Sequence, residues 1–281
     1  MEICRLFGAA GRPFRALVRR TADAGKRAEL ERLKAELVEG DLKDPASLQR
    51  ACVGARSLIS TASSTLSRQE GDSIQTVDNQ GQAALVDAAK LAGVEHFVFV
   101  SFRDNPEIQH PLTEAKRGVE RHLRESGMAY TILQASYFME IWLTPALGFD
   151  YRNAKARIYG NGNNKLSWVS YKDVARIAVA ALGEPRARNV VLNVGGPQPL
   201  SPREVVRIFE EAGAAEIAEE HVTESQLQTQ MSAANDPLQK SFAGLMLQYA
   251  SGDAMDVADT LKLFPFQLIS VRDYVAAQLT R

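Results

Sequence analysis

The sequence predicts an α/β protein in which helices cover both faces of a doubly wound parallel sheet. Short apolar runs alternate with longer stretches of helical periodicity through the first half of the chain, which is typical of βαβ units. Helix starts are marked by cap residues: Asp44 and Asp236 each precede a proline, and Ser201 opens a capping box that closes at Glu204. Right-handed crossovers between such units produce a Rossmann-type architecture.

Five apolar runs in the first half of the chain are predicted to be parallel strands. They cover residues 14–18, 35–38, 57–60, 96–100 and 130–133. Helices are predicted between them, near residues 23–34, 45–53, 73–92 and 112–126. Parallel neighbours need crossover connections of this kind, so the alternation itself favours a parallel sheet.

The chain opens inside a helix rather than in a strand. Ile3, Leu6, Phe7 and Ala10 follow helical spacing, and Gly11 is a natural stop. A dinucleotide fold should begin with a strand and a glycine-rich turn, and neither is present. We therefore expect a sheet that lacks its first strand, in a chain shortened from a longer protein by a misplaced start codon or a truncation.

The pattern changes after residue 145. Residues 157–162 and 166–169 are predicted to form a hairpin around an Asn/Gly turn, and residues 190–194 another strand. Gly160-Asn161-Gly162 is the only G-x-G, and Lys165 stands where a third glycine should be, so it is interpreted as a turn and not as a phosphate loop. We expect residues 146–281 to form a smaller mixed α/β lobe packed on a domain of residues 1–145.

Composition excludes several classes of function. With 33 basic and 34 acidic side chains, the formal net charge of -1 argues against a broad nucleic-acid-binding surface. No apolar run reaches the roughly 18 residues of a membrane span. Cys4 and Cys52 are the only cysteines, so neither a disulfide framework nor a cysteine zinc site is expected. The expectation is a cytoplasmic, metal-free protein that binds neither nucleic acid nor membrane.

Several short motifs, in this order and spacing, resemble the NmrA-like branch of atypical short-chain dehydrogenases/reductases. They are Arg15–Arg19, Glu39–Asp44 with Ser47-Leu48, Asp87–Ala89, Ala92–Val94, Phe97–Ser101, Lys116 with Glu120, Tyr130–Leu133 and Tyr137–Glu140. The resemblance implies NAD(P)H binding by residues 1–145 and substrate binding by residues 146–281. Family members include reductases, redox-sensing regulators and assembly factors. This chain departs from the family in lacking the N-terminal glycine motif, and Leu112 replaces the catalytic tyrosine of short-chain dehydrogenases.

Arg19 and Arg20 follow the second strand of the predicted fold, where such folds bind the adenosine ribose. An acid there would bind a ribose 2′-hydroxyl, whereas an arginine suits a 2′-phosphate. The strand end carries two arginines and no acid, which favours NADP(H) over NAD(H). The alternative is a solvated surface pair.

Other candidate cofactor-binding residues lie at the remaining strand ends. By resemblance, Asp41 and Leu42 flank the adenine, although a turn role suits Asp41 equally. The small residues Ser60, Thr61 and Ala62 would let a cofactor approach the backbone, and a polar turn explains them almost as well. The resemblance places the following residues beside the nicotinamide end: Ser101, Phe102, Tyr137 and Phe138. For Phe138, core packing is the stronger alternative.

Lys116 is the candidate catalytic residue and also a candidate cofactor ligand. It falls on the apolar stripe of its helix with Leu112, Ala115 and Val119, and burying an unpaired ammonium is costly. Hydroxyls of the nicotinamide ribose would be suitable partners, and a lysine that snorkels to solvent is the alternative. His96 is interpreted as structural, and His110 as an exposed loop residue.

Two hypotheses follow. The first is an NADPH-dependent oxidoreductase that reduces a small carbonyl or quinone-like acceptor. The second is a non-catalytic NADP(H)-sensing regulator or assembly protein, which the missing tyrosine favours, because a positioned acid is worth about 10²–10⁴-fold in rate. Either would bind a small molecule, and the sequence leaves a homo-oligomer open.

Overall fold

The computed structural model describes residues 1–65, 68–103 and 105–280, and it has the α/β class that the sequence predicts. The chain divides into two compact units. The first unit comprises Met1–Ser101, Glu114–Leu133 and Ala175–Val191. The second comprises Phe102–Thr113, Gln134–Val174 and Leu192–Arg281. Each unit is thus assembled from separate segments, and a functional division at residue 145 stays a prediction.

All five strands predicted in the first half of the chain are present. β1 (Arg15–Val18) pairs in parallel with β2 (Glu36–Glu39). β3 (Ser57–Ser60) pairs in parallel with β4 (His96–Phe102), register Ser57 to His96. β3 and β4 form a four-stranded sheet with β5 (Ala129–Ala135) and β8 (Val190–Val194), in the order β3-β4-β5-β8. The strand predicted over residues 190–194 is therefore also confirmed.

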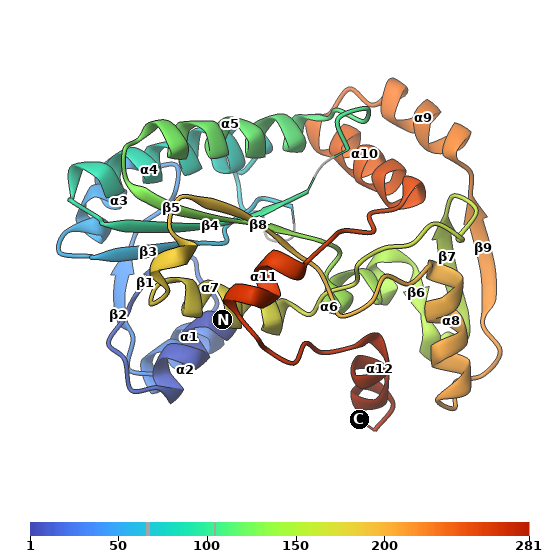
Figure 1. The fold of residues 1–281 in the computed structure, drawn as a ribbon. Helices are drawn as coiled ribbons and strands as arrows, with labels where there is room; N and C mark the ends of the chain where they lie inside the picture. The colour runs from blue at the N-terminus through green and yellow to red at the C-terminus, as the bar shows by residue number, and fades with distance from the viewer. Residues whose placement is uncertain (66–67, 104, 281) are drawn as a thin grey trace. The chain divides into compact units, whose positions relative to one another are not determined.

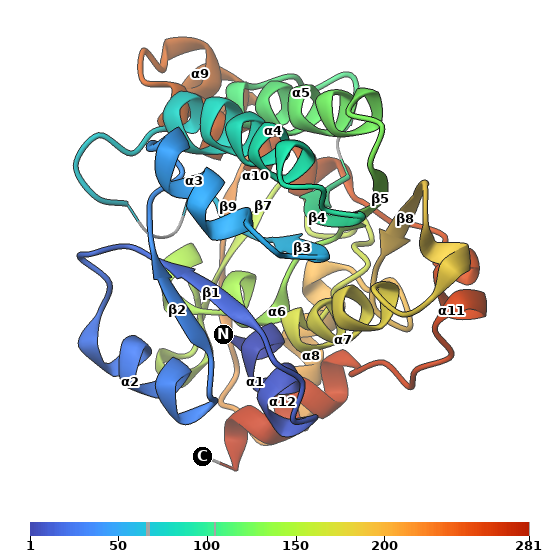
Figure 2. The same ribbon diagram turned by 90° about the vertical axis from the view of Figure 1, so that its left-hand side faces the viewer.

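The parallel strands lie in two sheets rather than one. Among the residues that the structure describes, no strand is hydrogen-bonded between β1 and β3 (Figure 2). In a doubly wound order, the strand that leads into the first crossover helix would occupy this place. The arrangement is the one expected of a sheet without its first strand, and β1 accordingly buries only Val18 well.

Helices cover both faces of the four-stranded sheet. α3 (Pro45–Cys52), α4 (Gln82–Leu91) and α5 (Pro111–Glu125) lie over one face, and α7 (Tyr171–Ala181) lies over the other (Figure 1). The first face is held by an apolar core that includes Leu48, Phe97, Phe99, Leu123 and Ile132. Burying each such side chain contributes about 1.5–3 kcal/mol, which makes this layer the stable base of the first unit.

The other helices of the first unit begin and end as their cap residues indicate. α1 (Glu2–Ala9) is followed by Gly11, whose φ of 60° suits the end of a helix, and α2 (Ala24–Arg32) is capped by Asp23. The helix predicted over residues 73–92 is present in two forms: a π-helix over Ile74–Gly81 and then α4. π-helical turns are rare and occur often at functional sites.

The predicted hairpin in the second unit is wrong. β7 (Lys155–Tyr159) pairs antiparallel with β6 (Phe149–Asp150) and parallel with β9 (Ala218–Val222). Residues 166–169 form isolated bridges, for example between Leu166 and Leu200. The Gly160 N–H donates to the Val222 carbonyl, so β9 takes the edge of β7 that a hairpin partner would have used.

The remaining helices lie in the second unit. They are α6 (Met139–Trp142), α8 (Pro202–Glu211), α9 (Glu224–Ala233), α10 (Pro237–Ser251), α11 (Ala258–Leu263) and α12 (Val271–Leu279). The caps predicted at Asp44, Ser201 and Asp236 are confirmed. Within the described ranges, no helix has the length and hydropathy needed to cross a membrane. Nor do the described histidines, cysteines and carboxylates gather in a group that could hold a metal.

Candidate functional site

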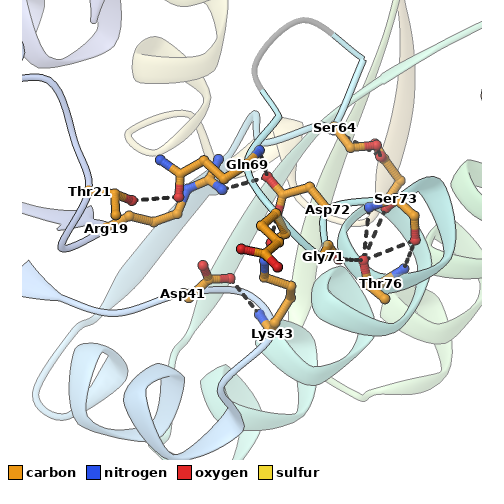
Figure 3. Close-up of polar contacts among 12 residues, drawn as sticks. Arg19, Thr21, Asp41, Lys43, Ser64, Gln69, Gly71, Asp72, Ser73 and Thr76 are labelled. Atoms are coloured by element: carbon orange, nitrogen blue, oxygen red, sulfur yellow. Dashed lines mark hydrogen bonds and ion pairs between the residues drawn. The ribbon is translucent and has the colours of Figure 1, made fainter.

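Two cations from neighbouring strand ends converge on one aspartate (Figure 3). Arg19 follows β1, and its Nη1 lies 2.5 Å from Asp72 Oδ2. Lys43 follows β2, and its Nζ lies 2.7 Å from Asp72 Oδ1. The Asp72 side chain is 0% exposed, whereas each cation keeps 27% of its side chain exposed. We call Arg19, Lys43 and Asp72 the Asp72 cluster.

Residues 69–72 are tied to both strand ends by hydrogen bonds (Figure 3). The Gln69 N–H donates to Asp72 Oδ2 over 2.9 Å, and Thr21 Oγ1 donates to Gln69 Oε1 over 2.5 Å. Burial acts to raise the pKa of Asp72, but hydrogen bonds from Lys43 and Arg19 prevail and lower it to about 2. Asp72 is therefore a carboxylate at neutral pH, and it holds two cations at the surface of the first unit.

The other residues predicted near the adenosine have structural contacts. Arg20 is almost fully exposed and pairs with Glu39 over 3.0 Å. Asp41 Oδ1 accepts from the Lys43 N–H over 2.8 Å, which is a turn contact. Leu42 is buried against Gly81 of the π-helix. A Cβ atom on Gly81 would lie only 2.8 Å from the Leu42 Cβ. The sequence analysis did not predict Lys43 and Asp72 as site residues. Lys43 could have been predicted, because it belongs to the Glu39–Asp44 motif.

Lys116 is buried against a second aspartate. Its Nζ lies 3.7 Å from Asp78 Oδ1, and the exposed fractions of the two side chains are 6% and 0%. Asp78 Oδ2 accepts from the Ser64 N–H over 2.9 Å and from Ser64 Oγ over 2.6 Å. The Nζ also lies 5.0 Å from the centre of the Phe99 ring. We call Ser64, Asp78 and Lys116 the Asp78 cluster; the snorkelling alternative for Lys116 is excluded by its burial.

Burial lowers the pKa of Lys116, and the neighbouring Asp78 acts in the opposite direction. Asp78 lies in the π-helix Ile74–Gly81, on a face shared with the buried residues Ile74 and Val77. Lys116 is a candidate because it is a charged residue on an apolar helix face. The same signal would have found Asp78, which sequence reasoning missed.

The small residues after β3 are anchored by a buried amide. Ser60 Oγ donates to Gln82 Oε1, and Gln82 Nε2 donates to the Ala62 carbonyl, each over 2.8 Å. Thr61, between them, is exposed. At the end of β4, Ser101 Oγ accepts from Arg117 Nη2 over 3.0 Å. Of these contacts, the bond from Gln82 to the Ala62 carbonyl holds the backbone directly after β3.

The second unit contains an aromatic cluster made of Tyr137, Trp142, Trp168 and Tyr249. Trp142 stacks on Tyr249 with ring centres 5.3 Å apart, and Tyr137 meets Tyr249 edge-on at 5.6 Å. Burial raises the pKa of Tyr137 well above its usual value. Phe138 occupies the N-cap position of α6 without a side-chain hydrogen bond to the helix, and it pairs with Val169 through a β-bridge.

Of the two histidines weighed from the sequence, one prediction is confirmed and one is wrong. His96 is buried, and its Nε2 lies 2.8 Å from Thr131 Oγ1, a structural role. His110 is not exposed: it is buried, its Nε2 lies 2.8 Å from Thr113 Oγ1, and its ring stacks on Phe102. Its loop is covered by α10, where Gly244 leaves space for the ring.

The carboxyl group of Asp253 is partly buried, with 15% of its side chain exposed, and lies next to Ser136, the residue that follows β5. Asp253 Oδ2 accepts from Ser136 Oγ over 3.1 Å, and Asp253 Oδ1 lies 3.8 Å from Arg103 Nη1. Burial raises the pKa of Asp253 to about 6, although Arg103 and the Ser136 hydrogen bond act to lower it. The sequence offered no periodic or motif signal for this residue.

Comparison with known proteins decides the family. The model of the NmrA-like family matches residues 2–265, nearly the whole chain. The chain belongs to the NmrA-like family. The resemblance carried by the short motifs is thereby confirmed, as is the fold class that it implied.

Proteins similar to this chain include enzymes and an assembly factor. An NAD(P)H azoreductase of Xenophilus azovorans is 33% identical over 241 residues, 84% of this chain and 78% of the relative. An isoflavone reductase homologue of Zea mays is 33% identical over 245 residues, 81% and 75% of the two chains. A photosystem II assembly factor of Trieres chinensis is 30% identical over 182 residues, 63% and 55% of the two chains.

Solved structures share the fold at lower sequence identity. Citrobacter triphenylmethane reductase, complexed with NADP(H), has a TM-score of 0.75 at 21% identity, covering 98% of this chain and 95% of its own. An NADPH-dependent quinone oxidoreductase of Escherichia coli, complexed with NADPH, has a TM-score of 0.76 at 20% identity, covering 99% and 95%. At these identities the likeness establishes the fold.

The described residues fit a dinucleotide of this family at its two ends. The exposed cations of the Asp72 cluster suit the phosphate-bearing adenosine end, and the buried ammonium of Lys116 suits hydroxyl acceptors. For the pyrophosphate, the described chain contains no glycine-rich turn, and α1 carries the acidic Glu2 in its first turn.

Proposed function

We propose that this NmrA-like protein is an NADPH-dependent oxidoreductase that reduces a small quinone-like or carbonyl acceptor. The observation that carries the proposal is the Asp78 cluster. A lysine with 6% of its side chain exposed is costly to bury, and Asp78 at 3.7 Å compensates the charge without a close ion pair. Donor capacity therefore remains on Lys116 for a ligand.

In this proposal, Lys116 donates hydrogen bonds to the nicotinamide ribose and so orients that end of the cofactor. Bound NADPH supplies a hydride. Arg19 and Lys43 bind the 2′-phosphate, and Ser60 to Ala62 let the cofactor approach the backbone. Ser101, Phe102 and Tyr137 border the nicotinamide end. The aromatic cluster of the second unit suits a flat, unsaturated acceptor, because aromatic rings stack on one another.

The second candidate function is a non-catalytic NADP(H)-sensing or assembly protein. Leu112 is buried, and by the resemblance it replaces the tyrosine that supplies a proton in short-chain dehydrogenases. One protein similar to this chain is a photosystem II assembly factor. Oxidation of NADPH with a panel of quinones and aldehydes separates the two candidates. Turnover supports the oxidoreductase, whereas tight NADPH binding without turnover supports the sensor.

The cofactor preference is tested by comparing NADPH and NADH affinities. NADPH is expected to bind more tightly, and Arg19→Ala is expected to remove most of the difference while sparing NADH. A charge-assisted hydrogen bond is worth about 1.5–3 kcal/mol, or about 10- to 150-fold in affinity. Arg32→Ala, which removes an exposed arginine from α2, is the matched control. Equal affinities of the unmodified protein for both cofactors would contradict the preference.

Cytoplasmic location stays a prediction, and the oligomeric state stays open. Size-exclusion chromatography with light scattering measures the second directly.

A further inference from the structure

A cavity in the second unit is lined by residues that were not predicted to bind the cofactor. It has a volume of about 660 Å³ and is formed by two strands, β7 and β9, and two helices, α9 and α10. Figure 1 shows these helices beside the two strands, and all four elements belong to the second unit. Small-molecule sites usually have volumes of about 300–1,000 Å³. The cavity is therefore large enough for a small organic ligand.

One face of α10 forms the helical side of the cavity. Its lining side chains are three, four and seven positions apart, which places them on the same helix face: Gln239, Phe242, Ala243 and Met246. The C-terminal end of α10 packs closely on β7, where a Cβ atom on Gly160 would lie 2.8 Å from the Ala250 Cβ. The cavity lies beside the first and middle turns of the helix, away from this close contact.

Two cross-strand pairs form the sheet side of the cavity. β7 and β9 are parallel, and their register sets Arg157 beside Glu220 and Tyr159 beside Val222. Successive side chains of a strand point to opposite faces, so these four residues share the face that lines the cavity. This face therefore carries a charged pair next to a mainly apolar pair.

The charged pair presents both signs of charge to a ligand. Of the described residues that line the cavity, only Arg157 and Glu220 are charged. Arg157 Nη2 lies 3.2 Å from Glu220 Oε2, and the two side chains are 45% and 68% exposed. This contact uses one nitrogen and one oxygen, which leaves further guanidinium N–H groups and Glu220 Oε1 for a ligand. A ligand with a single charge would be attracted by one of the two residues and repelled by the other.

The interior of the cavity is apolar. Leu227 of α9 and both Ala243 and Met246 of α10 are buried, and Phe242 is partly buried. An apolar group that leaves water for this surface gains about 25 cal/mol per Å². The cavity thus combines an apolar interior with two opposite charges that lie side by side.

We propose that this cavity binds an α-amino acid with a large apolar side chain. The carboxylate and the ammonium group of such a molecule are attached to the same carbon atom, so its opposite charges are adjacent, as are those of Arg157 and Glu220. The carboxylate accepts hydrogen bonds from Arg157, and the ammonium group donates to Glu220. The apolar side chain contacts Leu227 and Met246. This binding site is independent of the proposed oxidoreductase function.

The charge requirement is tested with three ligands that share one phenyl group. L-phenylalanine carries both charges, 3-phenylpropionate lacks the ammonium group, and phenethylamine lacks the carboxylate. Isothermal titration calorimetry without NADPH is expected to show saturable binding of L-phenylalanine and about fivefold weaker binding of each of the others, since exposed ion pairs are worth up to about 1 kcal/mol. Equal affinities for the three ligands, or no saturable binding of L-phenylalanine, would overturn the proposal.

Variants of the charged pair assign each charge to its partner. Arg157→Gln is expected to weaken L-phenylalanine about fivefold and to spare phenethylamine, which has no carboxylate. Glu220→Gln is expected to weaken L-phenylalanine equally and to spare 3-phenylpropionate. Arg207→Gln and Glu216→Gln, at exposed residues outside the cavity lining, are the matched controls. Unchanged binding of L-phenylalanine in both pair variants would overturn the proposal.

Ala243→Leu tests the location of the site. The larger side chain fills part of the cavity, so binding of L-phenylalanine is expected to be lost, and circular dichroism checks that the variant is folded. Binding that persists unchanged in the folded variant would count against this cavity. The charged-pair variants change exposed side chains and keep the test decisive if Ala243→Leu does not fold. Because no NADPH is present, a negative result leaves the oxidoreductase proposal unaffected.

Discussion

The Asp72 and Asp78 clusters use the same chemistry in different surroundings. Both aspartates have side chains that are 0% exposed, and each faces cationic side chains of the first unit. They differ in the cations: Arg19 and Lys43 remain partly exposed, whereas Lys116 is buried. The exposure of the cation, more than the identity of the acid, separates the two sites.

This difference in cation exposure decides whether the acid or the cation has the shifted pKa. In the Asp72 cluster, the pKa of the aspartate is lowered, because two solvated cations donate to it directly. In the Asp78 cluster, burial lowers the pKa of Lys116. The first cluster therefore presents charge to a ligand at the surface. The second holds one ammonium in place, at a cost that an open site would not incur.

Removal of the buried acid should have the largest effect. Asp78→Ala leaves the Lys116 ammonium and the Ser64 donors without their acceptor, and breaking a buried pair costs about 3–5 kcal/mol. The free energy of unfolding, measured by urea denaturation, is expected to fall by this amount. Asp87→Ala, at an exposed aspartate of α4, should change it by no more than about 0.5 kcal/mol.

The double variant Asp78→Asn with Lys116→Met sharpens this comparison. It replaces the buried charges by neutral groups of similar size, and such replacements are often neutral in stability. Most of the loss should therefore be recovered. If Asp78→Ala costs less than about 1 kcal/mol, the two clusters do not differ in the way described.

Lys116→Met tests whether the buried ammonium acts on the cofactor. Loss of a hydrogen bond from a charged donor should weaken NADPH binding by about 1.5–3 kcal/mol, or about 10- to 150-fold. Isothermal titration calorimetry measures the affinity, and near-ultraviolet circular dichroism checks that the variant is folded. Lys90→Met removes an exposed lysine from α4 and serves as control. Unchanged affinity and turnover would remove Lys116 from the site.

Asp72→Asn should have the smallest effect, and a pH-dependent one. The pKa of Asp72 is lowered to about 2 in the folded protein, against about 4 in the unfolded chain. Its contribution to the free energy of unfolding is therefore fully present above pH 4 and is lost as the pH falls towards 2. Since the cations are partly solvated, we expect Asp72→Asn to lower the free energy of unfolding by about 1 kcal/mol at neutral pH. Unfolding measured from pH 7 to pH 2 should show the two proteins converging in acid; a difference that is independent of pH would contradict this account.

Local signals were sufficient for most of the secondary structure. Strands β1 to β5, the helix of Lys116 and the caps at Asp44, Ser201 and Asp236 follow from periodicity and from side chains a few residues apart. The position of Lys116 on an apolar helix face likewise predicts that its ammonium group needs a buried partner, and Asp78 is that partner. These features depend on neighbours in the chain, which the sequence displays directly.

Periodicity and cap residues thus predicted the α/β class, most elements of the first unit and the position of Lys116 on the apolar face of its helix. Only the tertiary structure decided that β9 rather than residues 166–169 pairs with β7, that His110 is buried, and that Asp78 and Asp253 meet Lys116 and Ser136. Each of these depends on contact between segments far apart in the chain. Burial and charge compensation arise from such contacts, and no local pattern encodes which distant partner will supply them.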